Sequence, residues 1–220
     1  MLKGKLKLTM AVAMSAMFLL APISVKAESN DLNNFGTPAG FDWEAEKARQ
    51  KAVFEKFNRE HADQIHKKSE ISVPNGIFPP NIKKGQPLVT MDSSTCEQIP
   101  FIGHAGIVYD GSSTIEAHPG PGVHYGDPND WWSKKSLYIL SSRDTSNMDA
   151  AANYAKRQVG KHYNWSFWDH VTTDSFYCSQ LVWRSYIDNL GIDLCPGAWS
   201  IVSPNDILCS SRLNVDFAFH

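Results

Sequence analysis

The spacing of apolar positions predicts a long helix early in the chain. Residues 42–68 are rich in Glu, Lys, Ala and Gln, and Trp43, Phe54 and Phe57 recur on one face at helical spacing, with Val53 at its edge. Acidic and basic residues alternate around the rest of this stretch. We therefore expect its narrow apolar stripe to dock on the folded domain; a helix lying on a membrane surface is the alternative.

A β-rich block follows, in which short apolar runs are separated by turn residues. The expected strands are residues 88–90, 103–109, 114–118, 122–124 and 137–140. The sequence Asp110-Gly-Ser-Ser113 predicts a hairpin turn between the second and third of these strands, and Pro119-Gly-Pro-Gly122 ends the third. Strands this close together along the chain predict an antiparallel sheet.

Two helices are expected after the sheet. Ser146 can cap the first, which would run to Val159 and stop at Gly160. Residues 172–175 offer several N-caps for the second, which Gly191 would end and whose apolar positions are those of a core helix. A sheet followed by helices predicts the α+β class.

The first 27 residues have the pattern of a secretory signal peptide. Three lysines precede an apolar run that extends from residue 8 to residue 23, and Val25-Lys-Ala27 follows. We expect cleavage after Ala27 and a secreted or cell-surface protein without a stable membrane anchor. A retained anchor is the alternative, although the run is short and Pro22 interrupts it. We assign residues 28–84 to a leader and the first helix, and residues 85–220 to the main domain.

Charge then argues against one class of partner. Removing residues 1–27 leaves 17 basic and 23 acidic side chains, a formal charge of −6. Such a chain has no electrostatic footprint for nucleic acid. The sequence does not indicate an oligomeric state.

Four cysteines leave the disulfide pattern open. Cys195 and Cys209 lie close in sequence and could pair, whereas a bridge between Cys96 and Cys178 would consume both of those thiols. Sequence alone does not choose among the three connectivities.

Cys178, in SFYCSQLVW, is the candidate nucleophile. It lies near the expected start of the second helix after the sheet, where unpaired N–H groups and the helix dipole favour a thiolate. Thiolates are the nucleophiles of cysteine hydrolases, and N–H groups at the same helix start could bind an oxyanion. The alternative is that Cys178 only fills space in the core, as free cysteines often do.

Such a nucleophile needs an imidazole base oriented by another polar group. His104 and Glu116 are polar residues in otherwise apolar strands, and they share a face if the strands pair with an even sum of residue numbers. A three-residue loop at residues 111–113 would give that register. His118 lies on the same face as Glu116 and is a competing orienting residue, while Gly103 and Gly106 leave room beside His104.

In this order, GHAGIVY, STIEAH and YCSQLVW resemble motifs of the circularly permuted papain-like hydrolases of the NlpC type, particularly their YiiX-like branch. In the unpermuted relatives the Cys helix precedes the sheet, whereas here it follows. The resemblance covers roughly residues 85–208. It implies that residues 85–220 form a permuted papain-like hydrolase domain, in which an antiparallel sheet packs against the Cys-bearing helix, with an extra N-terminal helix before it.

The same resemblance implies roles for individual residues. Cys178 would be the nucleophile, with His104 as base and Glu116 as the orienting acid. The Cys178 N–H would help to hold the oxyanion. The expected substrate contacts are Tyr177, Ser179 and Tyr163. The implied activity is that of a secreted cysteine amidase or peptidase acting on a small peptide, a cell-wall fragment or an N-acyl compound, with no cofactor and no metal.

Rival classes have weaker support. The histidines show no HExxH or paired-ligand spacing for zinc, and there is no GxSxG, P-loop or G-x-G-x-x-G sequence. The remaining alternative is a module of the same fold that binds or transfers acyl groups without hydrolysis. Tryptophans that could build its ligand groove are Trp131, Trp132, Trp165, Trp168 and Trp199. Each of these residues is individually more typical of a core position.

Overall fold

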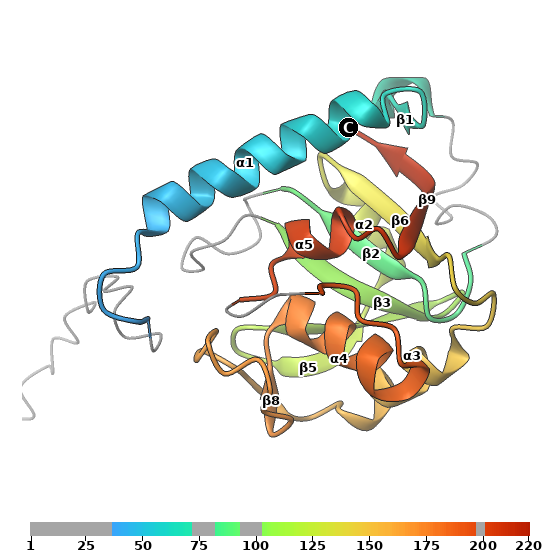
Figure 1. Cartoon of the computed structure of the whole chain (residues 1–220). Helices are drawn as coiled ribbons and strands as arrows, with labels where there is room; N and C mark the ends of the chain where they lie inside the picture. The colour runs from blue at the N-terminus through green and yellow to red at the C-terminus, as the bar shows by residue number, and fades with distance from the viewer. Residues whose placement is uncertain (1–36, 72–81, 93–102, 197–200) are drawn as a thin grey trace, which may run out of the picture. The chain divides into compact units, whose positions relative to one another are not determined.

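The computed structural model describes residues 37–71, 82–92, 103–196 and 201–220 (Figure 1). The expected signal peptide, Cys96 and Trp199 lie outside the described residues. Among the helices described, none combines the length and the apolar character that spanning a bilayer requires.

A seven-stranded sheet with the order β1-β9-β6-β2-β3-β4-β5 forms the centre of the fold. Its strands are β1 (Ile65–His66), β2 (Pro87–Thr90), β3 (His104–Asp110), β4 (Ser113–His118), β5 (Gly122–Gly126), β6 (Leu137–Ser142) and β9 (Leu213–Phe219). Neighbouring strands are antiparallel except for the parallel pair β1 and β9. Two short strands, β7 (His162–Tyr163) and β8 (Ser175–Phe176), form a separate parallel pair.

Helices lie on both faces of the large sheet, which confirms the α+β class (Figure 1). Those whose side chains join the larger core are α1 (Trp43–Glu60), α3 (Asp149–Arg157), α4 (Cys178–Leu190) and α5 (Pro204–Leu208). The short α2 (Pro128–Ser133) contributes Trp131 to a smaller core on the other face. A single 3₁₀ turn, η2 (Lys68–Glu70), follows β1.

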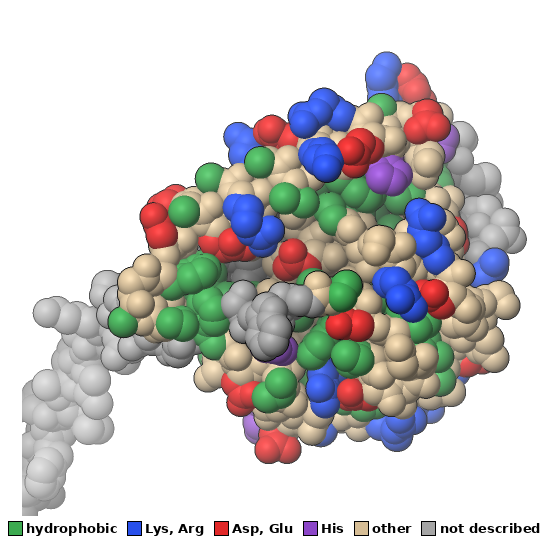
Figure 2. All heavy atoms as spheres, in the orientation of Figure 1, with side chains coloured by type: hydrophobic (Ala, Val, Ile, Leu, Met, Phe, Trp, Pro, Cys, Tyr) green, Lys and Arg blue, Asp and Glu red, His purple; other side chains and the backbone are tan. Residues whose placement is uncertain are grey.

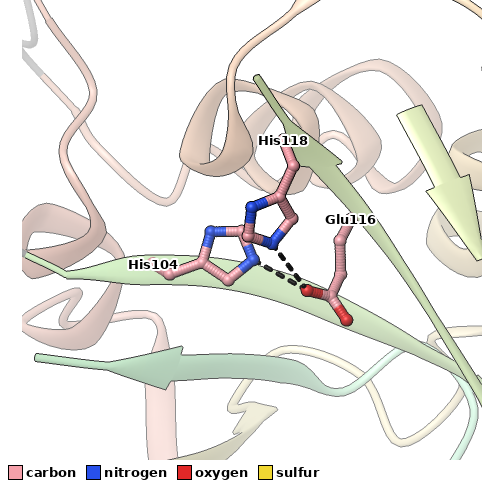
Figure 3. Close-up of side chains that lie close together, drawn as sticks. All are labelled: His104, Glu116 and His118. Atoms are coloured by element: carbon pink, nitrogen blue, oxygen red, sulfur yellow. Dashed lines mark hydrogen bonds and ion pairs between the residues drawn. The ribbon is translucent and has the colours of Figure 1, made fainter. Parts of the chain in front are cut away.

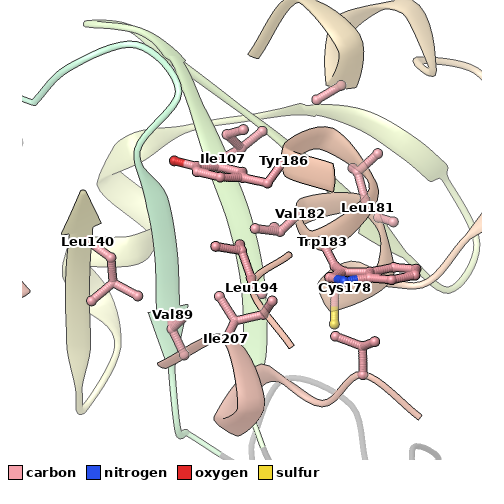
Figure 4. Close-up of a cluster of buried hydrophobic side chains, with 14 of the residues drawn as sticks. Val89, Ile107, Leu140, Cys178, Leu181, Val182, Trp183, Tyr186, Leu194 and Ile207 are labelled. Carbon is pink, nitrogen blue, oxygen red and sulfur yellow. The ribbon is translucent and has the colours of Figure 1, made fainter. Parts of the chain in front are cut away.

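Alternation along β3 divides its residues between these two cores. Ala105 and Ile107 pack with α4, and Figure 4 shows Ile107 near Val182 and Tyr186 of that helix. Val108 packs with Trp131 under α2. Because strand side chains alternate with a period of two, His104 points to the α2 side of the sheet and its neighbour Ala105 to the α4 side.

The β3–β4 hairpin has the expected even register, but a β-bulge produces it instead of a three-residue loop. Gly106 pairs with Glu116, which is the even register. The loop has two residues rather than the three predicted, because Asp110 pairs with Ser113 after a register shift between Val108 and Asp110. The extra residue of this β-bulge restores the parity that a three-residue loop would have given.

Three predicted helix ends are wrong, each because strand pairing or a side-chain hydrogen bond competes with the helix. The first helix ends at Glu60 rather than at residue 68, since Ile65–His66 pairs with β9. Helix α3 begins at Asp149 rather than after Ser146, because the Asn147 side chain accepts the Asp149 N–H. Residues 172–175 do not cap α4, whose N-cap is Tyr177, because Ser175–Phe176 forms β8.

Helix α1 docks through its apolar stripe, as predicted. Phe57 is buried, and its ring and that of Phe54 lie edge-on to Tyr138 of β6. The Tyr138 hydroxyl donates to Asn58 of α1 at 2.8 Å. Figure 2 shows Lys, Arg, Asp and Glu side chains intermixed along the outer side of this helix.

Candidate active site

The predicted base and its partner are in direct contact. His104, the first residue of β3, lies 2.8 Å from Glu116 of β4, measured from Nε2 to Oε2. His118, at the end of β4, brings its own Nε2 to 3.3 Å from the same oxygen (Figure 3). Glu116 is therefore the direct partner of His104, and His118 reaches the base only through Glu116 and by ring contact.

Glu116 accepts hydrogen bonds at both of its oxygens. Thr114 Oγ1 and Trp131 Nε1–H donate to Oε1, and the two imidazoles lie against Oε2. A carboxylate surrounded by four donors is acceptor-only, so each histidine donates through Nε2–H. This tautomer leaves Nδ1 of His104 as the lone-pair nitrogen, which is the form a general base requires.

Two opposing effects set the charge of this pair. Burial raises the pKa of Glu116, but hydrogen bonds from His104, His118 and Thr114 hold this pKa well below its usual range. Burial also lowers the pKa of His104 to about 4, against the raising effect of its bond to Glu116. At neutral pH the pair is therefore an ionised carboxylate and a neutral imidazole.

Two glycines make room for this arrangement. A Cβ at Gly106 would lie 2.7 Å from the Trp131 ring and 3.0 Å from Glu116 Cγ, and one at Gly126 would collide with Glu116 Oε1. The space predicted beside His104 is thus filled at Gly106 by Trp131. The Trp131 indole stacks on the His104 ring with centroids 5.3 Å apart, and so shields the His104–Glu116 bond from water.

Cys178 is the first residue of α4, as expected of a nucleophile at a helix start. Its thiol lies against the backbone amides of Ala105, Ser179 and Cys178 itself, and the residue is 2% exposed. Burial raises the pKa of the thiol to about 11, and these amides lower it by less. In this structure desolvation outweighs the helix start and favours the neutral thiol. Activation of Cys178 as a nucleophile stays a prediction.

The thiol lies beside the residue that follows the base, but the thiol and the base are not bonded. Cys178 touches Ala105, which follows His104 directly, yet no hydrogen bond joins Cys178 to His104 within the described residues. Their side chains approach the start of β3 from opposite faces of the sheet. The structure thus brings His104 and Glu116 together and places Cys178 beside the backbone of the base.

The predicted substrate contacts lie deeper than expected. Tyr177 and Ser179 are fully buried, and both hold Val202: the Val202 N–H donates to the Tyr177 hydroxyl, and Ser179 Oγ donates to the Val202 carbonyl. Tyr163 is nearly buried, against the rings of Trp165 and Phe167. Their contact with a substrate stays a prediction.

A buried amide pair that the sequence reasoning missed fixes the start of α4. Gln180 Oε1 accepts the N–H of Tyr177 and one Nδ2–H of Asn164, while Gln180 Nε2 donates to the Thr172 carbonyl. Both side chains are nearly inaccessible. Gln180 lies at the third position of α4, where a glutamine can cap the preceding turn, so its position in the helix is the signal that could have identified it.

His104, Glu116 and His118 also have the atoms of a metal site. Their nitrogen and oxygen atoms lie within 4.8 Å of one another. The contacts of 2.8 and 3.3 Å are hydrogen-bond lengths with Glu116 Oε2 as the shared acceptor, and we assign the group as a hydrogen-bonded network. The expectation that the site needs no metal stays a prediction.

The described cysteines are free thiols. Cys178, Cys195 and Cys209 form no disulfide with one another. The suggested Cys195–Cys209 bridge is therefore not formed, and the alternative Cys96–Cys178 bridge involves a residue that lies outside the described part of the chain.

Comparison with known proteins points to one family. Residues 86–196 match the family described as "permuted papain-like amidase enzyme, YaeF/YiiX, C92 family". The uncharacterized protein YycO of Bacillus subtilis (strain 168) is 29% identical over 117 residues, which are 50% of this chain and 46% of that protein. This chain therefore spans about half the length of that curated relative. The crystal structure of the metalloprotein YiiX from Escherichia coli O157:H7 aligns with a TM-score of 0.47 and 18% identity, over 61% of this chain and 98% of that one.

Proposed function

Because the chain belongs to the permuted papain-like amidases of the YaeF/YiiX group, we propose that it cleaves an amide bond with Cys178 as nucleophile, His104 as general base and Glu116 as the residue that orients the base. The observation that carries this assignment is the 2.8 Å bond from His104 to Glu116, one residue away from the backbone amide that touches the Cys178 thiol.

The chemistry follows from the protonation states. As Cys178 Sγ bonds to the substrate carbonyl carbon, the thiol proton passes to Nδ1 of His104, whose Nε2–H stays on Glu116. The carbonyl oxygen becomes an oxyanion, for which the N–H groups at the start of α4 are candidate donors. Nδ1 then returns the proton to the departing amine, leaving a thioester on Cys178. Water activated by the same nitrogen hydrolyses that thioester and releases the acid.

Reaction from a neutral Cys178 thiol and a neutral His104 imidazole places two requirements on the site. Since burial favours both the neutral thiol and the neutral imidazole, we propose that proton transfer accompanies carbon–sulfur bond formation instead of preceding it. The thiol and Nδ1 must also come within hydrogen-bond reach around the start of β3. Catalytic hydrogen bonds are often long before substrate binds.

The substrate and location are part of the proposal. An exported amidase would meet small peptides, cell-wall fragments and N-acyl compounds, and the pattern of residues 1–27 supports export.

The test combines turnover with trapping of the thioester. Purified protein is incubated with cell-wall muropeptides and with N-acyl amino acid amides, and products and acylated peptides are identified by mass spectrometry. We expect an acyl adduct on the peptide containing Cys178. Cys178→Ser and His104→Ala should lose ~10²–10⁴-fold or more in turnover, because base-assisted attack contributes at least that much. Glu116→Gln should lose less.

Cys209→Ser is the matched control and should keep full turnover, since that thiol donates to Asn205 of α5 rather than to a residue of the proposed site. Undiminished hydrolysis by Cys178→Ser would refute the nucleophile assignment.

One observation favours the second candidate, a binding module without hydrolysis: the buried, neutral thiol that makes no bond to His104. In that case the same compounds should bind, as seen by calorimetry, with neither turnover nor an adduct.

A further inference from the structure

We propose that His118 is a positioning residue for the base: by holding the Glu116 carboxylate and packing on the His104 ring, it fixes the orientation of His104. This inference rests on the proposed role of His104 as general base. His118 itself does not touch the reacting atoms.

The geometry joins His118 to the base in two ways. Its Nε2 lies 3.3 Å from Glu116 Oε2, the same oxygen that accepts the bond from His104. Its ring centroid lies 4.1 Å from that of His104, with the planes tilted by 40° (Figure 3). The pairing of Gly106 with Glu116, continued by two residues, sets His104 opposite His118 on the two strands, so the register itself creates this contact.

The contact has a direct consequence for Glu116. Thr114 and Trp131 hold Oε1, so Oε2 is the oxygen that faces the base. With His118 in place, Oε2 accepts from two donors, so both oxygens of the Glu116 carboxylate are fixed by two hydrogen bonds each. Without it, Oε2 keeps only His104, and the carboxylate plane is free to turn about the Oε1 side. A loosely held orienting group lowers the fraction of molecules in which Nδ1 points correctly.

The charge of His118 predicts the direction in which the pKa of His104 changes when His118 is removed. Positive charge on His118 disfavours positive charge on His104, and His118 shares with His104 the Glu116 oxygen that would stabilise a protonated His104. Removing His118 should therefore make His104 easier to protonate. The titratable groups in contact with His118 among the described residues are Glu116, His104 and His124, and Lys134 adds positive charge near His104.

The experiment measures the protonation state of His104 directly. Nitrogen NMR of the imidazoles in the full chain is followed against pH for the wild type, His118→Leu and His118→Gln. His124→Leu is the matched control, because His124 contacts His118 but bonds to the Gly122 carbonyl and not to Glu116. Hydrolysis of an N-acyl amino acid amide is measured on the same samples.

We expect His104 to carry its proton on Nε2 in the wild type and to titrate at higher pH in His118→Leu. The acid limb of turnover should move to higher pH with it, and kcat at pH 7 should fall about tenfold with KM unchanged, the loss typical of one hydrogen bond to a charged group. His118→Gln keeps an N–H donor and should recover most of kcat. The control should match the wild type.

Unchanged His104 titration and turnover in His118→Leu would overturn the inference. So would a loss as complete as that of His104→Ala, because His118 would then act at the reacting atoms. The NMR result does not depend on Cys178 chemistry, so failure of the proposed function, seen as full activity of Cys178→Ser, is distinguishable from failure of this inference.

Discussion

Glu116 and Cys178 are both buried, yet burial acts on them with opposite outcomes. Glu116 is ionised because its oxygens receive donors from four side chains. Cys178 has only backbone amides and a Ser179 hydroxyl 3.9 Å away, which are too weak to offset its desolvation. Position at a helix start is therefore insufficient to predict a thiolate when the side chain is also enclosed.

Alkylation of Cys178 tests this directly. With a pKa of about 11, labelling by iodoacetamide in the absence of substrate should be slow at pH 6 and rise about tenfold per pH unit into the alkaline range. The measurement is the rate of adduct formation on the peptide containing Cys178, by mass spectrometry. Fast labelling at pH 6 that is lost in His104→Ala would instead reveal a resting thiolate–imidazolium pair.

At the scale of single residues, the sequence predicted the His104–Glu116 pair but not the side chains that surround it. A polar residue within an apolar strand must find a partner, so His104 and Glu116 could be matched by parity alone. Thr114 was also within reach, since it lies two residues before Glu116 on the same face. Trp131 was not, because it comes from a helix beyond the hairpin and no local pattern says where that helix folds back.

Among the elements, α1 shows how a helix outside the matched region becomes part of the fold. Its stripe packs on Tyr138, and Asn205 of α5 donates to the Gln50 carbonyl within α1 at 3.1 Å. The ion pairs on its outer side, such as Lys51–Glu55, are exposed and contribute little. The helix is therefore held by apolar packing and a few buried hydrogen bonds.

Phe57→Ala should show how much this packing contributes to the free energy of unfolding. Phe57 is 7% exposed, and removing a buried phenylalanine ring costs about 3–5 kcal/mol of unfolding free energy. Lys51→Ala, on the outer side of the same helix, should change it by no more than about 0.5 kcal/mol. Urea unfolding followed by circular dichroism measures both variants. Equal effects would mean that α1 is not docked in solution.

The elements that the sequence reasoning missed have two physical causes. Strand β9 has an alternating pattern, Leu213-Asn-Val-Asp-Phe217, that was available but stood after the last expected helix, outside the sheet block. Its place between β6 and β1 is a long-range pairing that periodicity does not encode. Helices α2 and α5 are only five or six residues long, too short for a helical period to appear.

For the whole molecule, the buried His104–Glu116 pair makes stability depend on pH. The pKa of His104 is lowered from an ordinary 6.5 to about 4, so the unfolded chain binds a proton at this residue first as pH falls. The pKa of Glu116 is also lowered, and its contribution is lost as pH falls further through the folded value. Both effects therefore remove stability on acidification.

We expect the free energy of unfolding to fall between pH 6.5 and pH 4, and to fall less steeply in His104→Asn, which removes the proton uptake of the unfolded state at this position. Urea titrations at pH 7.5, 6.5, 5.5 and 4.5 give the slope. A wild-type profile that is flat across this interval would contradict the buried neutral imidazole.

The bulge between Val108 and Asp110 has a consequence for how this hairpin can vary over evolution. Inserting or deleting one residue in β4 between Ser113 and Glu116, with the two-residue loop and the bulge unchanged, would place Glu116 on the other face of the sheet, in the apolar layer beneath α4. Adding or removing two residues would keep Glu116 on the face of His104, as would a single insertion that also removed the bulge. Natural length changes in β4 between Ser113 and Glu116 should therefore occur in even steps or together with loss of the bulge, and a homologue with an uncompensated odd step should have lost its orienting carboxylate. A longer loop at residues 111–112 should leave the register unchanged.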